Sequence, residues 1–139
     1  MSKDWVKDIN EMQTKYGTRE WVDTQLELTN IGKLHKFLEF RAAFLQEELD
    51  ETKAALSPTF DPEEVVDGLI DLCVVAIGTL DAFGVDPYKA WDAVHAANMT
   101  KEVGVKASRP NPLGVPDLIK PEGWIAPSHV GNHGLLNNI

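Results

Sequence analysis

One stretch of this 139-residue chain, residues 69–80, is apolar on nearly every side of the helix that its pattern predicts. Asp61, Pro62 and Glu64 come before it, as an N-cap, a first-turn proline and a capping-box acid do at the start of a helix. Gly84 marks the expected end. Because a helix that is apolar all round must be buried, the pattern predicts a central helix with other helices packed around it.

Other segments show the spacing of amphipathic helices. Residues 2–16 place apolar side chains four, three and four positions apart, with Ser2 as the cap. A long helix is expected over residues 30–56 and a last one over residues 86–101. Residues 18–30 fit either irregular chain or a helical turn. The fold class predicted is all-α, a bundle of four to five helices.

The amino-acid composition of the chain changes after Lys101 and Glu102. Residues 103–139 hold five of the eight prolines and five of the ten glycines. We therefore expect a helical domain at residues 1–102 and an irregular C-terminal arm at 103–139, which packs on that domain or on a neighbouring subunit. Four helices provide little cover for a central helix that is apolar all round, so a homo-oligomer, either a dimer or a tetramer, is expected to supply the rest.

The charge balance excludes some classes of partner. The 13 Lys and Arg residues face 22 Asp and Glu residues, which leaves a net charge of −9 and argues against binding nucleic acid or anionic membranes by general electrostatics. Cys73 is the single cysteine, so no internal disulfide can form, and a reduced cytoplasmic location is expected. The longest strongly apolar run, residues 72–80, is too short to cross a membrane.

The acidic residues are concentrated on two expected helices. Ten of the 22 acids lie between Glu39 and Asp71. Residues three or four positions apart share a helix face, and a short loop makes the two helices antiparallel neighbours. The end of one helix then lies beside the start of the other, which brings together two clusters: Glu47, Glu48 and Glu51, and Asp67 and Asp71.

Converging carboxylates repel one another and raise one another's pKa, and a hard divalent cation relieves that repulsion. Mg²⁺ and Mn²⁺ prefer oxygen ligands and need neither histidine nor cysteine. Asp71 has apolar neighbours on both sides, where an unpaired carboxylate is costly to bury. The alternative is a solvated acidic surface, with Asp67 favoured by the helix dipole. The two clusters together favour a metal site.

Several motifs resemble one known family. QEELDE at residues 46–51, VVDGLIDLCVVAIGTLDAFGVD at 65–86, VHAANMTK at 94–101 and KPEGW at 120–124 look like the all-α nucleoside triphosphate pyrophosphohydrolases. The nearest branch is the MazG-like one related to phosphoribosyl-ATP pyrophosphohydrolase. The resemblance covers residues 33–127 and implies a MazG-like helical bundle whose catalytic part lies in residues 1–102.

The family pattern is Glu-Glu-x-x-Glu on one helix and Glu-x-x-Asp on the next. Glu47, Glu48 and Glu51 match the first part intact. For the second part, matching the apolar run makes Asp71 the family aspartate and puts Gly68 at the glutamate, so that Asp67 substitutes. Keeping the spacing pairs Glu64 with Asp67 instead. We prefer Asp67 with Asp71 because Glu64 already serves as a capping acid; the fourth ligand and the number of metal ions stay open.

The resemblance implies a hydrolase that uses Mg²⁺, with Mn²⁺ as a substitute. Such an enzyme cleaves a nucleoside triphosphate between its α and β phosphates and releases a monophosphate and pyrophosphate. Glu47 is our candidate for accepting the proton of the attacking water, with Glu48 as the second choice. The expected role is control of nucleotide pools. Making a modified genome is a further option, because MazZ-type relatives act on dGTP.

Phosphate contacts are expected from the last helix and from the arm. The resemblance carries over Asn98 and Lys101 as substrate-binding residues, and His95 shares their stripe, although packing is an alternative for this histidine. Lys120 and Trp124 belong to the arm, where the tryptophan either anchors packing or helps close the site, in its own or a neighbouring subunit.

Cations on the long helix are further candidates. Lys33 and Arg41 precede the acids and could bind phosphate, but salt bridges to Glu39 or Glu48 are an equal alternative. Two tryptophans near the N-terminus, at positions 5 and 21, are expected in the core or at its rim, with one as an option for stacking on the base.

Two other classes were considered. Di-iron helical bundles need repeated Glu-x-x-His motifs, which this chain lacks. A non-enzymatic acidic interaction protein of the DNA-mimic type predicts acids spread along an exposed face and no response to Mg²⁺. The clustering of the acids favours the enzyme.

Overall fold

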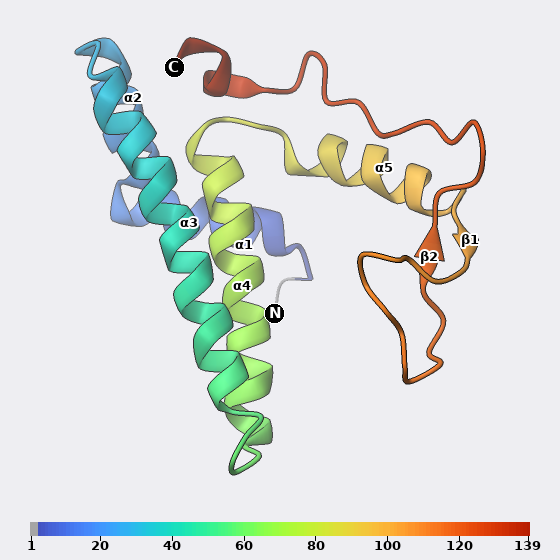
Figure 1. The fold of residues 1–139 in the computed structure, drawn as a ribbon. Helices are drawn as coiled ribbons and strands as arrows, with labels where there is room; N and C mark the ends of the chain where they lie inside the picture. The colour runs from blue at the N-terminus through green and yellow to red at the C-terminus, as the bar shows by residue number, and fades with distance from the viewer. Residues whose placement is uncertain (1–2) are drawn as a thin grey trace. The chain divides into compact units, whose positions relative to one another are not determined.

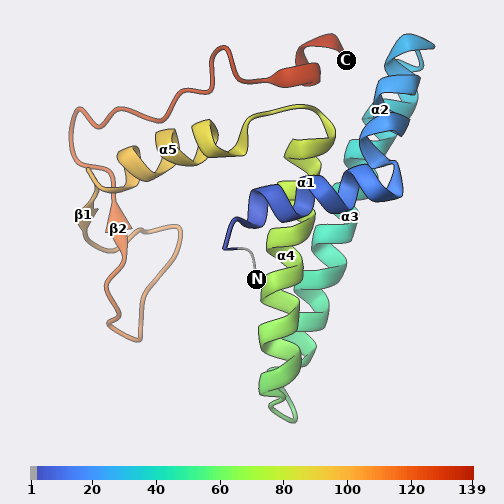
Figure 2. The ribbon, with the colours of Figure 1, turned by 180° about the vertical axis from the view of Figure 1, so that it is seen from behind.

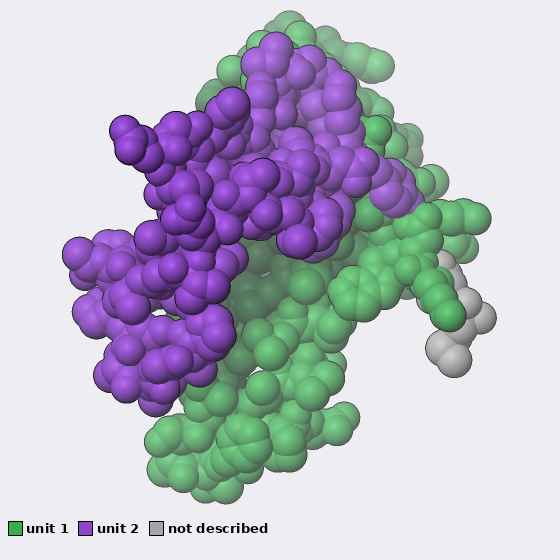
Figure 3. Space-filling model, turned by 90° about the vertical axis from the view of Figure 1, so that its right-hand side faces the viewer, with its two compact units in different colours: residues 1–87, 133–139 green, residues 88–132 purple. Residues whose placement is uncertain are grey.

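The computed structural model describes residues 3–139, so the expected cap Ser2 lies outside the described residues. The chain forms two compact units: residues 1–87 with 133–139, and residues 88–132 (Figure 3). Five α-helices make up most of the described chain, which confirms the prediction of an all-α fold. Within residues 3–139, no helix is both long and apolar enough to cross a membrane.

Two helices begin the first unit. Helix α1 spans Trp5–Tyr16 and begins at Asp4, whose carboxylate accepts a hydrogen bond from the Lys7 backbone N–H at 3.1 Å. It ends at Gly17, where φ is +78°, a conformation that glycine adopts without a steric penalty. Helix α2, Thr18–Glu27, follows at once, so the segment that was ambiguous from sequence is helical.

Helices α3, Ile31–Ala54, and α4, Pro62–Ala82, form an antiparallel pair and lie side by side in Figures 1 and 2. Asp61 caps α4 as expected, since its carboxylate accepts hydrogen bonds from the backbone N–H groups of Glu63 and Glu64 at 3.1 and 3.2 Å. The predicted pairing, with the end of α3 beside the start of α4, is therefore confirmed.

Two glycines let α4 approach its neighbours closely. A Cβ atom on Gly68 would lie 2.1 Å from Thr52 Oγ1 on α3. A Cβ on Gly78 would lie 2.7 Å from an Arg41 guanidinium nitrogen, and the Gly78 carbonyl accepts a 2.6 Å hydrogen bond from Gln13 of α1. The missing side chains thus make room for polar groups of α3 and α1 against the α4 backbone.

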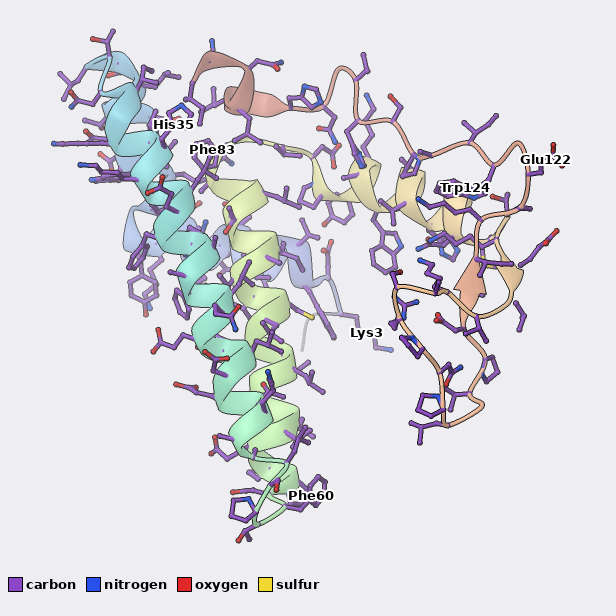
Figure 4. All side chains as sticks on the ribbon, in the orientation of Figure 1. Lys3, His35, Phe60, Phe83, Glu122 and Trp124 are labelled. Atoms are coloured by element: carbon purple, nitrogen blue, oxygen red, sulfur yellow. The ribbon has the colours of Figure 1, made fainter. Side chains whose placement is uncertain are left out.

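The apolar core of this unit lies where α3 begins and α4 ends. Phe83, Leu34 and Val22 are its fully buried large side chains, and Phe83 is labelled in Figure 4. The chain's last residues pack onto the same core as a 3₁₀ helix, Gly134–Asn138, in which the Leu135 N–H donates a 2.7 Å hydrogen bond to the Phe83 carbonyl. The end of the predicted arm is therefore ordered against the helices.

The expectation that α4 is buried on every side is wrong for the single chain. Val66 is 64% exposed and Leu69 51% exposed, while Val75, Ala82 and the two glycines are buried. The reason is geometric: α1, α2 and α3 cover only part of the surface of α4.

The second unit contains α5, Pro87–Asn98, apart from its first residue, and most of the arm. The arm has a short antiparallel pair that the sequence pattern did not predict, β1 at Glu102–Val103 and β2 at Leu118–Ile119. The loop between the strands is held by an ion pair between Arg109 and Asp117.

Candidate active site

The predicted acids gather around Glu48. The pKa of Glu48 is raised above its ordinary value, first by desolvation and then by the negative charges of four neighbours: Glu51, Asp71, Glu47 and Asp67. These are the four other residues predicted as ligands. The α3–α4 pairing therefore concentrates negative charge from both helices on one carboxylate.

One oxygen of Glu48 is in a costly position. Its Oε2 atom is inaccessible to solvent and has no hydrogen-bond partner. The nearby Thr52 hydroxyl does not satisfy it, because that hydroxyl donates to the Glu48 backbone carbonyl at 2.8 Å. A buried ionised oxygen without a donor is unfavourable, so this site suits a cation or a proton.

The side chains do not yet form a coordination shell. Within residues 3–139, no three Asp, Glu, His or Cys side chains converge closely enough to hold a metal ion as they stand. Glu47 and Glu51 line an open hollow of about 530 Å³ along α3, beside Asp50. The structure thus provides five oxygen donors in one region, and rotation of exposed side chains such as Glu47 and Glu51 would be needed to close a shell.

The departure from the family pattern at Gly68 coincides with a steric obstacle. Gly68 stands where the apolar-run alignment puts the family glutamate, and Thr52 occupies the space that a side chain there would need. Asp67 and Asp71 both raise the pKa of Glu48, whereas Glu64 is not among its neighbours in charge. The structure therefore brings Asp67 and Asp71 to Glu48, and not Glu64.

Arg41 lies inside the α3–α4 interface. Its Nε donates to Thr79 Oγ1 at 2.9 Å and a terminal nitrogen donates to the Val75 carbonyl at 3.2 Å. The guanidinium also lies against the rings of Phe37 and Phe44, at 5.8 and 5.9 Å from their centroids, and burial lowers its pKa. These contacts use two of the five N–H donors of the guanidinium and link α3 to α4.

Lys33, the other cation proposed on the long helix, is exposed. Among residues 3–139, neither Lys33 nor Arg41 forms the salt bridge to Glu39 or Glu48 that was the alternative.

Three predicted substrate residues meet within the second unit. The ammonium groups of Lys101 and Lys120 lie 5.4 and 5.0 Å from the centroid of the Trp124 ring, and Trp124 is labelled in Figure 4. The indole N–H donates to the Ala97 carbonyl of α5 at 3.0 Å. A pocket of about 520 Å³ adjoins this group, lined by residues of α5 and of the arm segment 121–128.

The remaining two candidates lie on α5. Asn98 is exposed at the end of the helix, and His95 is exposed and stacks on Trp91 at 6.3 Å between ring centroids. Neither is buried, so the packing role considered for His95 is limited to this stacking.

Sequence reasoning missed a second hollow, in the first unit. Trp5 and Asp8 of α1 line a pocket of about 200 Å³ together with Cys73 of α4. Trp21, the other tryptophan considered for base stacking, instead packs against Phe37 at 5.3 Å. Only the crossing of α1 and α4 creates this pocket. The sequence signal was the i, i+3, i+4 spacing of Trp5, Asp8 and Ile9, which places them on one face of α1.

Comparison with protein families gives one match. The model of the phosphoribosyl-ATP pyrophosphohydrolase family matches residues 19–98, which is more than half of the chain and includes all five clustered acids. Searches of curated proteins and of solved structures each found no match. The resemblance noted from the motifs is confirmed, and the chain belongs to the phosphoribosyl-ATP pyrophosphohydrolase family, whose activity is nucleotide pyrophosphohydrolysis.

Proposed function

We propose that this protein is a divalent-metal-dependent pyrophosphohydrolase of nucleoside triphosphates. It cleaves between the α and β phosphates of a (d)NTP, releases the monophosphate and pyrophosphate, and serves in the control of nucleotide pools. The observation that carries the proposal is the crowding of four carboxylates around the buried, unpartnered oxygen of Glu48. Family membership supports the reaction class.

The donor set fits Mg²⁺, with Mn²⁺ as a substitute. All five candidate ligands are carboxylates, which hard cations prefer, and the chain's −9 charge would otherwise repel a triphosphate. When bound, the metal neutralises phosphate charge and acidifies a bound water. Glu48, Glu51, Asp67 and Asp71 would hold it.

The proton of the attacking water needs an acceptor among the same residues. The sequence favoured Glu47. Glu48 is the second choice, because it is among the proposed ligands and a bound cation would offset the neighbouring charges that raise its pKa. We propose Glu47 for this role, with Glu48 as the second candidate.

We propose that phosphate is bound by residues outside the acid cluster. Lys101 and Lys120, held around Trp124, and Asn98 at the end of α5 are the proposed contacts. His95 and Lys33 are exposed and are kept as further contacts. For Arg41 we instead propose a structural role, because two of its donors already bind α4 and its guanidinium lies against the rings of Phe37 and Phe44.

The test is a pyrophosphate-release screen over the four standard dNTPs, the rNTPs and modified dNTPs, with Mg²⁺ and with Mn²⁺. We expect release that depends on either cation and stops with a chelator. A complete lack of release, with no cation effect on stability, would favour the alternative of an acidic DNA-mimic protein.

We further propose that the protein works in the cytoplasm as a homo-oligomer, a dimer or a tetramer, without nucleic acid or membrane partners. The exposed apolar side chains of α4, among them Val66 and Leu69, support an interface between copies. Size-exclusion chromatography at micromolar concentration should show a dimer or a larger species, and elution only as a monomer would contradict this.

A further inference from the structure

Helix α1 crosses α4 within the first unit (Figure 2), and the crossing forms a pocket of about 200 Å³. Three residues of α1 and three of α4 line it: Trp5, Asp8, Ile9, Ile70, Cys73 and Val74. Sites for drug-sized ligands measure about 300–1,000 Å³. This smaller pocket therefore suits one planar ring system and not a whole nucleotide.

The pocket shares a face of α4 with the acid cluster. Asp67, Ile70, Asp71 and Val74 are spaced i, i+3, i+4 and i+7, which is one stripe along a helix. Two of them are proposed metal ligands, and the other two line the pocket. A nucleotide with its base in the pocket would therefore extend its phosphates along α4 toward the acids.

The lining combines a large aromatic side chain with one charge. Trp5 is 53% exposed, so its ring surface is open to a ligand, and the other lining side chains apart from Asp8 are apolar or a thiol. Asp8 is exposed at the pocket and is the single charged group of the lining. An ionised carboxylate only accepts hydrogen bonds, so it selects a ligand edge that carries donors.

Building on the proposed function, we propose that this pocket holds the nucleobase, with Trp5 packing on the ring and Asp8 selecting guanine. Guanine presents two neighbouring donors, N1–H and the N2 amino group, which match the two oxygens of one carboxylate. Adenine and cytosine present a donor beside an acceptor, and thymine presents one N–H between two carbonyl groups. Among the standard bases, only guanine satisfies both oxygens of Asp8.

The decisive variant is Asp8→Asn, with Asp23→Asn on the exposed surface of α2 as the matched control. We expect wild-type kcat/KM to be about 10- to 100-fold higher for dGTP than for dATP, the range that one good bidentate base contact provides. An asparagine amide has one donor and one acceptor, which complement adenine. Asp8→Asn should therefore lose the preference for dGTP and show a higher kcat/KM for dATP. Asp23→Asn should behave as wild type.

Trp5 is tested separately from base choice. Trp5→Ala should lower kcat/KM for all four dNTPs by a similar factor of about 5 to 100, because every base has a face that can stack on the ring. Trp5→Phe should restore part of this loss. In wild type, the kcat/KM for dITP, which lacks the N2 amino group, should lie between the values for dGTP and dATP.

Binding provides a readout that does not need turnover. Cys73 is the only cysteine and lines the pocket, so its reaction with a thiol reagent reports occupancy. We expect dGMP to slow this reaction in wild type and not in Asp8→Asn, and dAMP to have little effect in wild type. Calorimetric titration with the two monophosphates should give the same order.

The outcomes separate the two proposals. Pyrophosphate release without a guanine preference would overturn the proposed base pocket and leave the proposed hydrolase activity intact. So would an Asp8→Asn variant whose turnover of all four dNTPs is equally slowed. Selective protection of Cys73 by dGMP in a protein that hydrolyses no triphosphate would keep the pocket and overturn the hydrolase. Equal protection by dGMP and dAMP would also overturn the selection of guanine.

Discussion

Two carboxylates, the half-buried Glu48 and the buried Asp81, lie toward opposite ends of the α3–α4 pair, and each has one inaccessible oxygen without a hydrogen-bond partner. Around Glu48 the nearest charges are four more acids. The neighbours of Asp81 are instead hydrogen-bond donors and a cation. Asn10 donates to its Oδ1 at 2.8 Å, and an Arg19 guanidinium nitrogen lies 4.0 Å from the same oxygen. Each has one oxygen that solvent does not reach, and the neighbouring residues decide what each carboxylate can do.

The surroundings of Asp81 are those of a structural link. Asn10 comes from α1 and Arg19 from α2, so one side chain of α4 ties three helices beside the core. Its local charge is already balanced. The charge of Glu48 is not balanced in this way, because its charged neighbours are acids. Binding of a proton or a cation would relieve their repulsion. The comparison predicts that matched changes at the two ends will separate function from stability.

The largest effect is expected on turnover. Asp71→Asn and Glu51→Gln should each reduce pyrophosphate release by more than about 100-fold, because even an outer partner of a metal ligand costs 10- to 100-fold when removed. Asp81→Asn makes the same chemical change ten residues further along α4 and should keep turnover within a few-fold. Helical circular dichroism should persist in all three, and near-normal turnover in Asp71→Asn and Glu51→Gln would contradict the ligand assignment.

The next effect is on thermal stability. Millimolar Mg²⁺ or Mn²⁺ should raise the melting temperature of wild type by on the order of 5–10 °C, as expected for a ligand near 100 times its dissociation constant. Asp81→Asn should keep this increase, and Glu48→Gln should lose most of it. An equal increase in both variants, measured by differential scanning fluorimetry, would mean that the cation binds elsewhere.

A smaller effect should appear at the other end of α4. Asp81→Ala leaves the Asn10 amide and the Arg19 guanidinium without their acceptor and should lower the free energy of unfolding by about 1–3 kcal/mol. Asp23→Ala, at an exposed position on α2, should change it by less than about 0.5 kcal/mol. Urea denaturation measures both, and equal values would remove the structural role of Asp81.

The smallest effect is the pH dependence of stability in chelator-treated protein. The pKa of Glu48 is raised on folding, so between its ordinary value of 4.5 and the raised value the folded state binds more protons than the unfolded state. Stability should therefore fall as pH increases through that window, and Glu48→Gln should remove this part of the decrease. Urea titrations at several pH values test this, and an unchanged slope in the variant would contradict it.

Local patterns predicted much of the fold because their physical causes are local. The Asp61 cap, for example, depends on neighbouring residues alone. The pairing of α3 with α4 followed from a short connection. The return of residues 133–139 to the core and the β1–β2 pair depend on distant partners, which no nearby pattern reveals.

The candidate site also has features that local sequence predicted and features that only the packed helices revealed. Its acids could be named from helical spacing, and their gathering around Glu48 agrees with that expectation. The role of Arg41 could not be named, because a cation near acids looks the same whether it faces phosphate or the Val75 carbonyl. Gly68 looked like a missing ligand, and its fit against Thr52 became visible only with both helices in place.

The sequence by itself determined where four of the five helices run and which five carboxylates two of them carry, because capping, periodicity and charge act over one or two turns of chain. Only the tertiary structure decided which carboxylate is buried among acids and which among donors. It also decided where α1 and α4 enclose a pocket. Desolvation and contact depend on which helices pack together, and residues 71 and 81 of one helix therefore have different environments.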